Sequence, residues 1–269
     1  MAEEPKTEES QQWGLNDEYP VTEEQVASLH EQGWAALPNL LSREAVDAML
    51  PRLSASRSRD QKRPDEHRGP GDDHNPNINH DEMAWRDPVF REIATSRRLA
   101  SAATRLMKQE TVLFVEDVSF FKPARGRQSG YHQDFSYWPF DRKGTITVWV
   151  ALVDMSEDMG PLRYLEGSHL EGPLGFDDGN NILDAYPHLQ NRKIVGGKPI
   201  SAGDAQVHWD LTIHGAGPNN TDTVRAAYSL RYIRTDTIYT GMSHPHFDAF
   251  QLPSGRPFAE SGLFPFIGA

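Results

Sequence analysis

Apolar residues recur with a helical period up to Gln109 and then gather into short, strand-like runs. Thr22 opens a capping box, which predicts a helix that begins there and ends near Gly33. A second helix is expected from Ser42, with Pro51 near its end. Both helices are interpreted as scaffold.

A third helix is predicted from Pro88, which Asp87 caps, and its apolar stripe continues to Met107. Beyond this helix, β-branched and aromatic residues alternate with Gly, Pro, Asn and Asp turns. Strands are predicted at 111–115, 118–121, 145–153, 163–165, 194–195, 205–207 and 225–233. Helices followed by many short strands indicate an α+β chain, mainly β, with a sandwich or jelly-roll core buttressed by N-terminal helices.

Two segments are too polar to form packed elements. Residues 1–18 are predicted to be a flexible tail, which leaves 19–269 as a single domain. Residues 54–82 are dense in charge, Pro, Gly and Asn, and we expect a mobile, lid-like or disordered loop. Possible metal ligands at 72–74 and 80–82 lie in this loop, where no scaffold would fix their geometry.

Charge and cysteine content restrict the chemistry. The 269-residue chain carries 27 basic and 39 acidic side chains, a formal net charge of −12. A negative field attracts neither phosphate backbones nor anionic lipids, so we expect no nucleic-acid and no membrane partner. The chain contains no cysteine, which excludes thiolate metal sites and a cysteine nucleophile. A metal would have to be bound by His, Asp or Glu.

The first residues are acidic, unlike the basic and then apolar start of a signal peptide. No run approaches the roughly 18 apolar residues that a membrane helix needs. We therefore expect a cytoplasmic protein. A small molecule is the expected partner, and the chain is expected to be a monomer or a homodimer.

The sequence contains three His-x-Asp motifs, at 132–134, 208–210 and 246–248. Residues two apart on a strand point to the same side, so such a motif presents an imidazole and a carboxylate to one cavity. With a histidine from a neighbouring strand, the pair binds one face of Fe(II) and leaves three positions open. The first motif fits best, because a long apolar strand and a distant histidine follow it. The second is interpreted as polar residues at a barrel rim, and the third as a surface turn.

His214 and Arg225 lie 11 residues apart, with a Gly-Pro-Asn-Asn turn between them. This spacing lets His214 end one strand and Arg225 begin the returning strand, close to the same cavity. A guanidinium binds a carboxylate through two parallel hydrogen bonds, so a dicarboxylic co-substrate could be chelated to a metal at one end and held by Arg225 at the other. A structural salt bridge is the alternative role for Arg225.

Together these residues resemble the phytanoyl-CoA dioxygenase (PhyH) family. The resemblance spans about residues 20 to 235 and rests on the order of several motifs: GWAALPNLL at 33–41, FKP at 121–123, HQD at 132–134, Trp149, GPL at 160–162, EGSH at 166–169, HGAGPN at 214–219 and Arg225. It implies a double-stranded β-helix (jelly-roll, cupin-like) fold that uses Fe(II), 2-oxoglutarate and O2, with ascorbate as a candidate reductant.

Carried over by position, the resemblance implies that His132, Asp134 and His214 bind iron. Arg225 would bind the distal carboxylate of 2-oxoglutarate. The implied reaction oxidises an unactivated C–H bond while 2-oxoglutarate is converted to succinate. Hydroxylation is the default outcome, and cyclisation, epimerisation or desaturation are the alternatives seen in natural-product tailoring members.

Thr147 and Trp149 occupy positions that line the co-substrate pocket in similar proteins, and the strand period places both on one side. Two positions depart from the family pattern. Ala216 stands where a small hydroxyl residue is common, and Leu162 stands where some relatives have threonine. Co-substrate binding is therefore expected to depend more on Arg225 and Thr147.

Phe135, Tyr137 and Trp138 follow the iron motif directly and are the predicted substrate contacts, with residues 54–82 as a lid. Ordinary core packing is the alternative for these aromatic side chains. An aromatic, mostly apolar pocket suits a bulky natural product or lipid. A CoA thioester fits less well, because its phosphates would need a denser basic cluster than this acidic chain offers.

Two other functions remain open. A cupin-like metal enzyme that uses no 2-oxoglutarate would share the fold and the ligands, although Arg225 at its spacing argues against it. A non-catalytic binding protein on the same barrel is the second alternative, and three intact ligand candidates argue against that.

Overall fold

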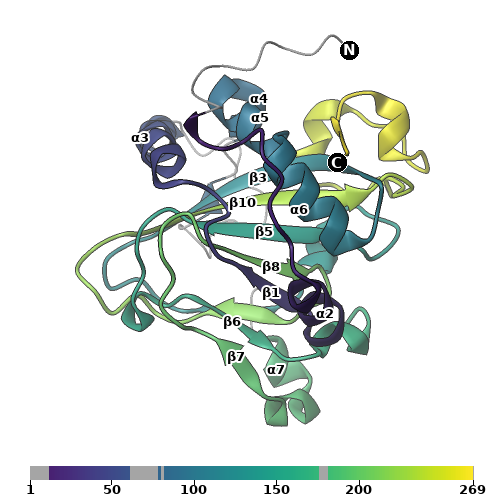
Figure 1. Ribbon diagram of the computed structural model, residues 1–269. Coiled ribbons are helices and arrows are strands. Elements are labelled where there is room, and N and C mark those ends of the chain that lie inside the picture. Colours follow the sequence, from purple (N-terminus) through teal and green to yellow (C-terminus); the bar gives the residue numbers. More distant parts are fainter. Residues whose placement is uncertain (1–11, 61–77, 80–81, 176–180, 269) are drawn as a thin grey trace.

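The computed structural model describes residues 12–60, 78–79, 82–175 and 181–268, and two antiparallel sheets form its centre (Figure 1). The larger sheet has the strand order β1 (Trp34–Leu37), β8 (Ala205–Trp209), β5 (Ile146–Ala151), β10 (Arg225–Arg234), β3 (Thr111–Lys122) and β11 (Phe266–Gly268), with β2 (Ile78–Asn79) also paired to β3. The smaller sheet has the order β4 (Ser129–His132), β9 (His214–Ala216), β6 (Leu162–Leu165) and β7 (Ile194–Gly196).

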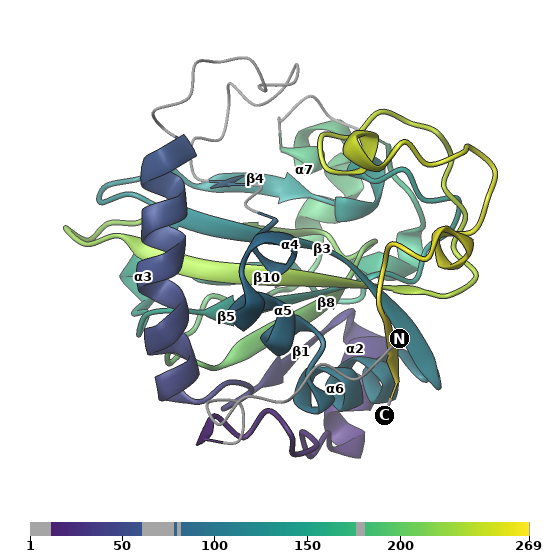
Figure 2. The same cartoon turned by 90° about the horizontal axis from the view of Figure 1, so that it is seen from above.

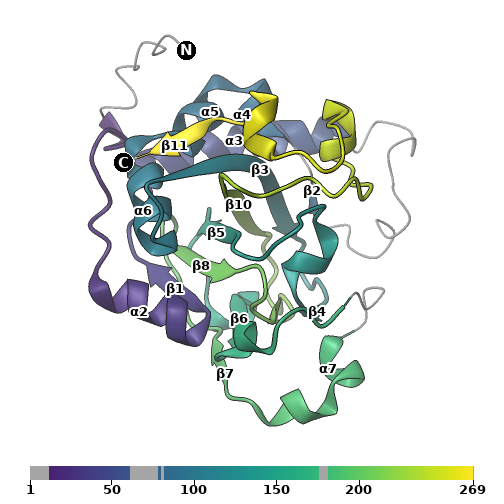
Figure 3. The same ribbon diagram turned by 90° about the vertical axis from the view of Figure 1, so that its right-hand side faces the viewer.

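Figure 3 shows the larger sheet curving from β3 to β1 over the smaller sheet. Side chains from both sheets meet in one buried cluster, to which the larger sheet contributes Trp149 and Ala227 and the smaller sheet contributes Tyr164 and Ala216. The two sheets thus enclose a common interior. This is the predicted jelly-roll, or double-stranded β-helix, with helices outside it.

Helices cover the outer face of the larger sheet (Figure 2). They are α2 (Glu23–Gln32), α3 (Arg43–Asp60), α4 (Met83–Arg86), α5 (Pro88–Ala94) and α6 (Arg97–Met107), while α7 (Ile182–Ala185) lies beside β4. Short 3-10 turns are η2 (Asp134–Tyr137), η3 (Glu157–Met159), η4 (Ser168–Glu171), η5 (Pro187–Asn191), η6 (Phe247–Phe250) and η7 (Phe258–Ser261). No helix among the described residues combines the length and the apolar character needed to cross a bilayer.

The capping signals explain where α2 begins and ends. The Thr22 side chain accepts a hydrogen bond from the backbone of Gln25, and the Gln25 side chain accepts one from the backbone of Thr22, as predicted. Gly33 ends the helix with φ of 91°, a left-handed conformation that glycine adopts without strain.

Helix α3 is longer than predicted. Pro51 lies inside it, and the helix continues to Asp60, so the first residues of the predicted 54–82 loop are helical. Leu53 and Ser56 are buried and continue the stripe begun by Met49, so tertiary packing outweighs the cost of the proline. Residues 61–77 and 80–81, on which the lid and the 72–74 ligand cluster depend, lie outside the described part of the chain.

The N-terminal tail is also shorter than predicted. Trp13 and Leu15 are buried in the main core, and the Leu15 carbonyl accepts a hydrogen bond from the Arg98 amide at 3.1 Å. Two apolar side chains in a polar segment thus anchor its last residues, because burying each contributes about 2 kcal/mol. Residues 1–11 lie outside the described part.

Three further expectations are corrected. The helix predicted from Pro88 is divided into α5 and α6, because Ser96 caps a new start by accepting from the Leu99 amide. The strands predicted at 111–115 and 118–121 form one strand, β3. The third His-x-Asp motif is no surface turn, since His246 and Phe247 are almost completely buried.

Candidate metal centre and co-substrate pocket

The first His-x-Asp motif and the distant histidine meet inside the barrel. His132 ends β4 and pairs directly with His214, which begins β9, while Asp134 begins η2. Asp134 Oδ1 lies 3.5 Å from His132 Nε2 and 3.6 Å from His214 Nε2. One ligand atom from each of the three residues fits within a span of 4.8 Å. Three such atoms surround a space that one metal ion could fill.

Hydrogen bonds fix the orientation of both histidine rings. His132 Nδ1 lies 3.0 Å from the Gly130 carbonyl, and His214 Nδ1 lies 3.0 Å from the Thr212 carbonyl. A carbonyl oxygen only accepts, so each Nδ1 carries the hydrogen and each Nε2 keeps its lone pair for a metal.

Electrostatics place Asp134 and His214 in the charge states that metal binding requires. Burial and the neighbouring His208 lower the pKa of His214 well below its ordinary value, so the imidazole is neutral. Burial tends to raise the pKa of Asp134, but the surrounding histidines outweigh it and hold that pKa well below its ordinary value. An ionised carboxylate and a neutral imidazole suit a divalent cation.

The second carboxylate oxygen of Asp134 is held by two other side chains. The Thr147 hydroxyl donates to Asp134 Oδ2 at 2.9 Å, and His208 Nε2 lies 3.4 Å from the same oxygen. Thr147, predicted as a co-substrate contact, therefore contacts an iron-ligand candidate. The interpretation of His208 as a rim residue is wrong, because its side chain is 1% exposed.

A pair of buried cations occupies another part of the barrel interior. Arg225 in β10 pairs with Lys122 in β3, so both side chains lie on the inner face. Arg225 Nη1 donates to the Gly160 carbonyl at 2.7 Å, and Lys122 Nζ donates to the Gly217 carbonyl at the same distance. Arg225 also lies over the Trp149 ring, 5.5 Å from its centroid.

Neither cation has a carboxylate partner among the described residues. Burial lowers the pKa of Arg225 to about 10, and burial together with Arg225 lowers the pKa of Lys122 to about 7. The alternative of a structural salt bridge for Arg225 thus finds no support in the described structure. Two buried cations without a counter-ion indicate a site for an anion.

Unsatisfied polar atoms line the same inner face. Gln206 in β8 and Ser229 in β10 both pair with Trp149, one on each side of it. Gln206 Oε1, Ser229 Oγ and Arg225 Nε are buried and have no hydrogen-bond partner within the described chain. Buried polar atoms are nearly always paired, so this face is suited to a polar ligand.

The predicted substrate contacts divide into two environments. Trp138 is buried in an aromatic core, where its ring lies 5.3 Å from the Arg231 guanidinium. Tyr137 is 37% exposed, and its ring meets the His132 ring edge-on at 6.0 Å. Phe135 is half-buried. A substrate role stays a prediction for all three, and the position beside a candidate ligand favours Tyr137.

Sequence reasoning missed two residues of this site. Lys122 lies in the FKP segment, but only the strand pairing shows that it lies opposite Arg225. His208 belongs to a motif of the right type, but only the strand pairing shows that it points toward Asp134.

Solved structures support the fold. The protein resembles the α-ketoglutarate-dependent carbocyclase SnoK from nogalamycin biosynthesis, with a TM-score of 0.78, 23% identity, and coverage of 92% of this chain and 97% of that one. The epimerase SnoN from the same biosynthesis matches with a TM-score of 0.69 and 23% identity, and the match covers 91% of this chain and 97% of SnoN. EctD from S. alaskensis, solved with 2-oxoglutarate and 5-hydroxyectoine, matches with a TM-score of 0.67 and 21% identity. This match covers 83% of this chain and 79% of EctD.

Curated relatives match over shorter stretches. A phytanoyl-CoA dioxygenase of Arabidopsis thaliana is 27% identical over 154 residues, which is 56% of this chain and 54% of that protein. Phytanoyl-CoA dioxygenase domain-containing protein 1 of Bos taurus is 27% identical over 153 residues, which is 54% of this chain and 52% of that protein. The chain thus spans about half the length of the curated relatives it matches.

The match to the phytanoyl-CoA dioxygenase (PhyH) family model covers residues 29–227, which include the three metal-ligand candidates and both buried cations. This match confirms the resemblance drawn from the ordered motifs. The chain belongs to the phytanoyl-CoA dioxygenase (PhyH) family.

Proposed function

We propose that this protein is a non-heme Fe(II)/2-oxoglutarate-dependent dioxygenase that oxidises a C–H bond of a small molecule. The observation that carries the proposal is the combination of two features in one barrel. One is a His-Asp-His ligand set in which Asp134 and His214 have the charge states that suit a divalent metal. The other is the Lys122–Arg225 pair, two buried cations without a carboxylate partner among the described residues.

In this proposal His132, Asp134 and His214 hold the iron, and Lys122 and Arg225 hold the distal carboxylate of 2-oxoglutarate. When bound, iron and 2-oxoglutarate together supply the oxidising chemistry, with succinate as the co-product and O2 as the oxidant. The donor set of two imidazoles and one carboxylate is the set that suits non-heme Fe(II) oxygenases.

The chain's own side chains orient these groups. The Gly130 and Thr212 carbonyls keep the two imidazole lone pairs directed at the metal position. Trp149 packs against the Arg225 guanidinium, and Gly160 fixes one of its nitrogens. Arg225 Nε then remains as a donor for the co-substrate, in a buried interior that excludes water and strengthens each charge contact.

The substrate part of the proposal is a bulky, largely apolar natural product of secondary metabolism, such as an antibiotic precursor. SnoK and SnoN, with which this chain shares its fold, come from nogalamycin biosynthesis. Exposed Tyr137 beside His132 offers an aromatic surface for such a molecule. Hydroxylation, cyclisation, epimerisation and desaturation are all compatible outcomes, with the protein acting in the cytoplasm as a monomer or homodimer.

Anaerobic titration tests the proposal without knowledge of the substrate. Adding 2-oxoglutarate to the Fe(II)-loaded protein should produce a visible metal-to-ligand charge-transfer band that saturates at one equivalent. Arg225→Met should bind iron normally and require far more 2-oxoglutarate. Iron binding without the band would favour a cupin-like enzyme that uses no 2-oxoglutarate, and absence of iron binding would favour a non-catalytic binding protein. Screening natural products for stimulated succinate release would then identify the substrate.

A further inference from the structure

We propose that the second His-x-Asp motif, at 208–210, positions the carboxylate of the first, with His208 as the residue that holds the outer oxygen of Asp134. The inference rests on the metal site of the proposed function. His208 is buried, is not an iron-ligand candidate and is not among the proposed co-substrate contacts, and the inference gives it a positioning role.

Three histidines surround Asp134, but they contact different oxygens. His132 and His214 approach Oδ1, whereas His208 Nε2 approaches Oδ2 at 3.4 Å. The His208 and His214 rings lie 4.0 Å apart between centroids, so His208 has little room to turn. The geometry therefore separates two ligand imidazoles from one that faces the far side of the carboxylate.

The hydrogen-bond partners of the three rings support this separation. His132 and His214 each direct Nδ1 at a carbonyl oxygen, which leaves Nε2 without a hydrogen. His208 directs Nδ1 at the Tyr164 hydroxyl, 3.4 Å away, and a hydroxyl can donate to it. Because the Asp134 carboxylate only accepts, His208 Nε2 carries a hydrogen and donates. A nitrogen that donates in this way has no lone pair for a metal.

Holding Oδ2 restricts how the carboxylate can bind a metal. Thr147 and His208 together occupy this oxygen, which leaves Oδ1 as the atom that faces the two ligand imidazoles. A freely rotating carboxylate could offer both oxygens and take up a position that the co-substrate or O2 needs. Partners that orient a ligand typically contribute roughly 10- to 100-fold to metal affinity.

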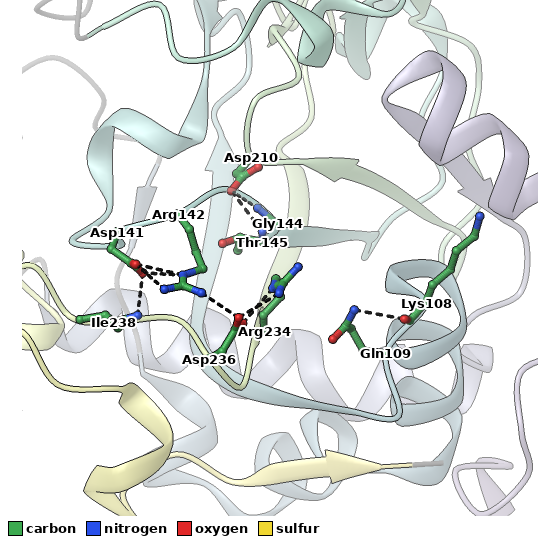
Figure 4. Close-up of polar contacts among 10 residues, drawn as sticks. All are labelled: Lys108, Gln109, Asp141, Arg142, Gly144, Thr145, Asp210, Arg234, Asp236 and Ile238. Carbon is green, nitrogen blue, oxygen red and sulfur yellow. Dashed lines mark hydrogen bonds and ion pairs between the residues drawn. The ribbon is translucent and has the colours of Figure 1, made fainter.

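Asp210 supports the same arrangement through the backbone. Its carbonyl accepts from the Phe135 amide at 3.0 Å, directly after Asp134. Its side-chain Oδ2 accepts from the Gly144 and Thr145 amides at 2.9 and 3.1 Å, as Figure 4 shows. One residue thus fixes both the turn that carries Asp134 and the start of the strand that carries Thr147.

Iron affinity of the full-length protein tests this inference. His208→Leu removes the donor, and we expect Fe(II) binding, measured anaerobically against a chelator, to weaken by roughly 10- to 100-fold. His208→Gln retains an N–H donor and should recover part of the loss. His246→Leu is the matched control, because His246 is equally buried in the third motif and contacts Glu82 and the Val115 carbonyl instead. It should leave iron affinity of the folded protein unchanged.

Pulsed electron paramagnetic resonance of the Fe(II)–NO complex counts the coordinated imidazoles, and it therefore distinguishes a positioning residue from an iron ligand. Two coordinated imidazoles are expected in the wild type and in the His208 variants. A decrease from three to two in His208→Leu would overturn the inference, because His208 would then be a ligand itself. Unchanged iron affinity in His208→Leu would also overturn it. Should His208→Leu fail to fold, His208→Phe, which keeps a planar ring but has no N–H donor, takes its place in both measurements, and wild-type iron affinity in it would overturn the inference.

Failure of the proposed function would look different. If the wild type bound Fe(II) tightly but gave no 2-oxoglutarate band and no succinate, the dioxygenase proposal would fail. The His208 result would still stand, since metal affinity does not depend on 2-oxoglutarate. If the wild type formed succinate and His208→Leu bound iron normally, this inference alone would fail.

Discussion

The two ends of the barrel interior differ in how buried charge is compensated. At the metal end, the charge of Asp134 is surrounded by Thr147 and three histidines, and each oxygen has a partner. At the other end, Lys122 and Arg225 lie side by side with carbonyl contacts and no carboxylate among the described residues. A compensated charge keeps a fixed geometry, while an uncompensated pair is ready to receive a ligand. In the proposed function, the first end holds the metal and the second end holds an anion that enters and leaves.

Removing the metal end should have the largest effect. Asp134→Ala takes away the anionic ligand and should reduce both Fe(II) binding and succinate formation to background. His246→Ala, a buried substitution outside both ends, is the control. Undiminished turnover in the Asp134 variant, measured as succinate release, would contradict the assignment of the metal site.

Replacing Arg225 should change 2-oxoglutarate affinity and the stability of the ligand-free fold in opposite directions. Arg225→Met should weaken 2-oxoglutarate binding by about 2–5 kcal/mol, since one partner of a buried charge pair is lost. The same change should raise the unfolding free energy of the ligand-free protein by about 1 kcal/mol, because an uncompensated buried charge is gone. Titration and denaturant unfolding check the two halves. A loss of stability together with unchanged binding would mean that Arg225 is merely structural.

Lys122 should make co-substrate binding depend on pH. Its pKa is lowered to about 7 in the ligand-free fold, and a dicarboxylate binds its charged form. Affinity should therefore be constant below about pH 7 and fall by at most about tenfold per pH unit above it. Lys122→Met should bind more weakly and lose this dependence. A wild-type profile that stayed flat from pH 6 to 9 would argue that Lys122 does not touch the co-substrate.

The lowered pKa of Lys122 also predicts that the unfolding free energy of the ligand-free protein rises with pH, whereas co-substrate affinity falls. Above about pH 7, the unfolded chain keeps a proton on Lys122 that the folded chain has released. The contribution of Lys122 to the unfolding free energy should therefore rise with pH from about 7 toward 10.5, the ordinary value. Comparing ligand-free wild type with Lys122→Met by denaturant unfolding at several pH values isolates this contribution.

Removing the hydrogen bond between Thr147 and Asp134 at the metal end should have the smallest effect. Thr147→Val keeps the volume of the side chain but leaves Asp134 Oδ2 with His208 alone. A net loss of about 1 kcal/mol, or roughly fivefold in iron affinity, is expected. Thr147→Ser, which retains the hydroxyl, should behave nearly as the wild type. A loss of iron affinity in Thr147→Ser with wild-type affinity in Thr147→Val would point to packing instead of the hydrogen bond.

Local sequence signals predicted the elements that follow local rules. The capping box at Thr22 and the apolar run around Trp149 fix a helix start and a central strand without help from the rest of the chain. Short strands such as β9 and β11, three residues each, carry too little local pattern, and pairing across the sheet decides them. The extension of α3 past Pro51 likewise depends on what Leu53 packs against.

The site divides in the same way. His132, Asp134, His214 and Arg225 could be selected because the order and spacing of their motifs resemble the family pattern, although Asp134 lies in η2 and not on a strand. Lys122 and His208 could not, since their roles depend on the register between β3 and β10 and between β5 and β8. Register brings residues far apart in sequence onto one face, and the sequence alone does not state it.

A crystal structure of the anaerobic complex with Fe(II) and 2-oxoglutarate tests the two-ended site most directly. Iron should be bound to His132 Nε2, Asp134 Oδ1 and His214 Nε2. The distal carboxylate should lie within hydrogen-bond distance of Arg225 and Lys122. Iron bound elsewhere, or a distal carboxylate directed away from these two cations, would contradict the proposed site.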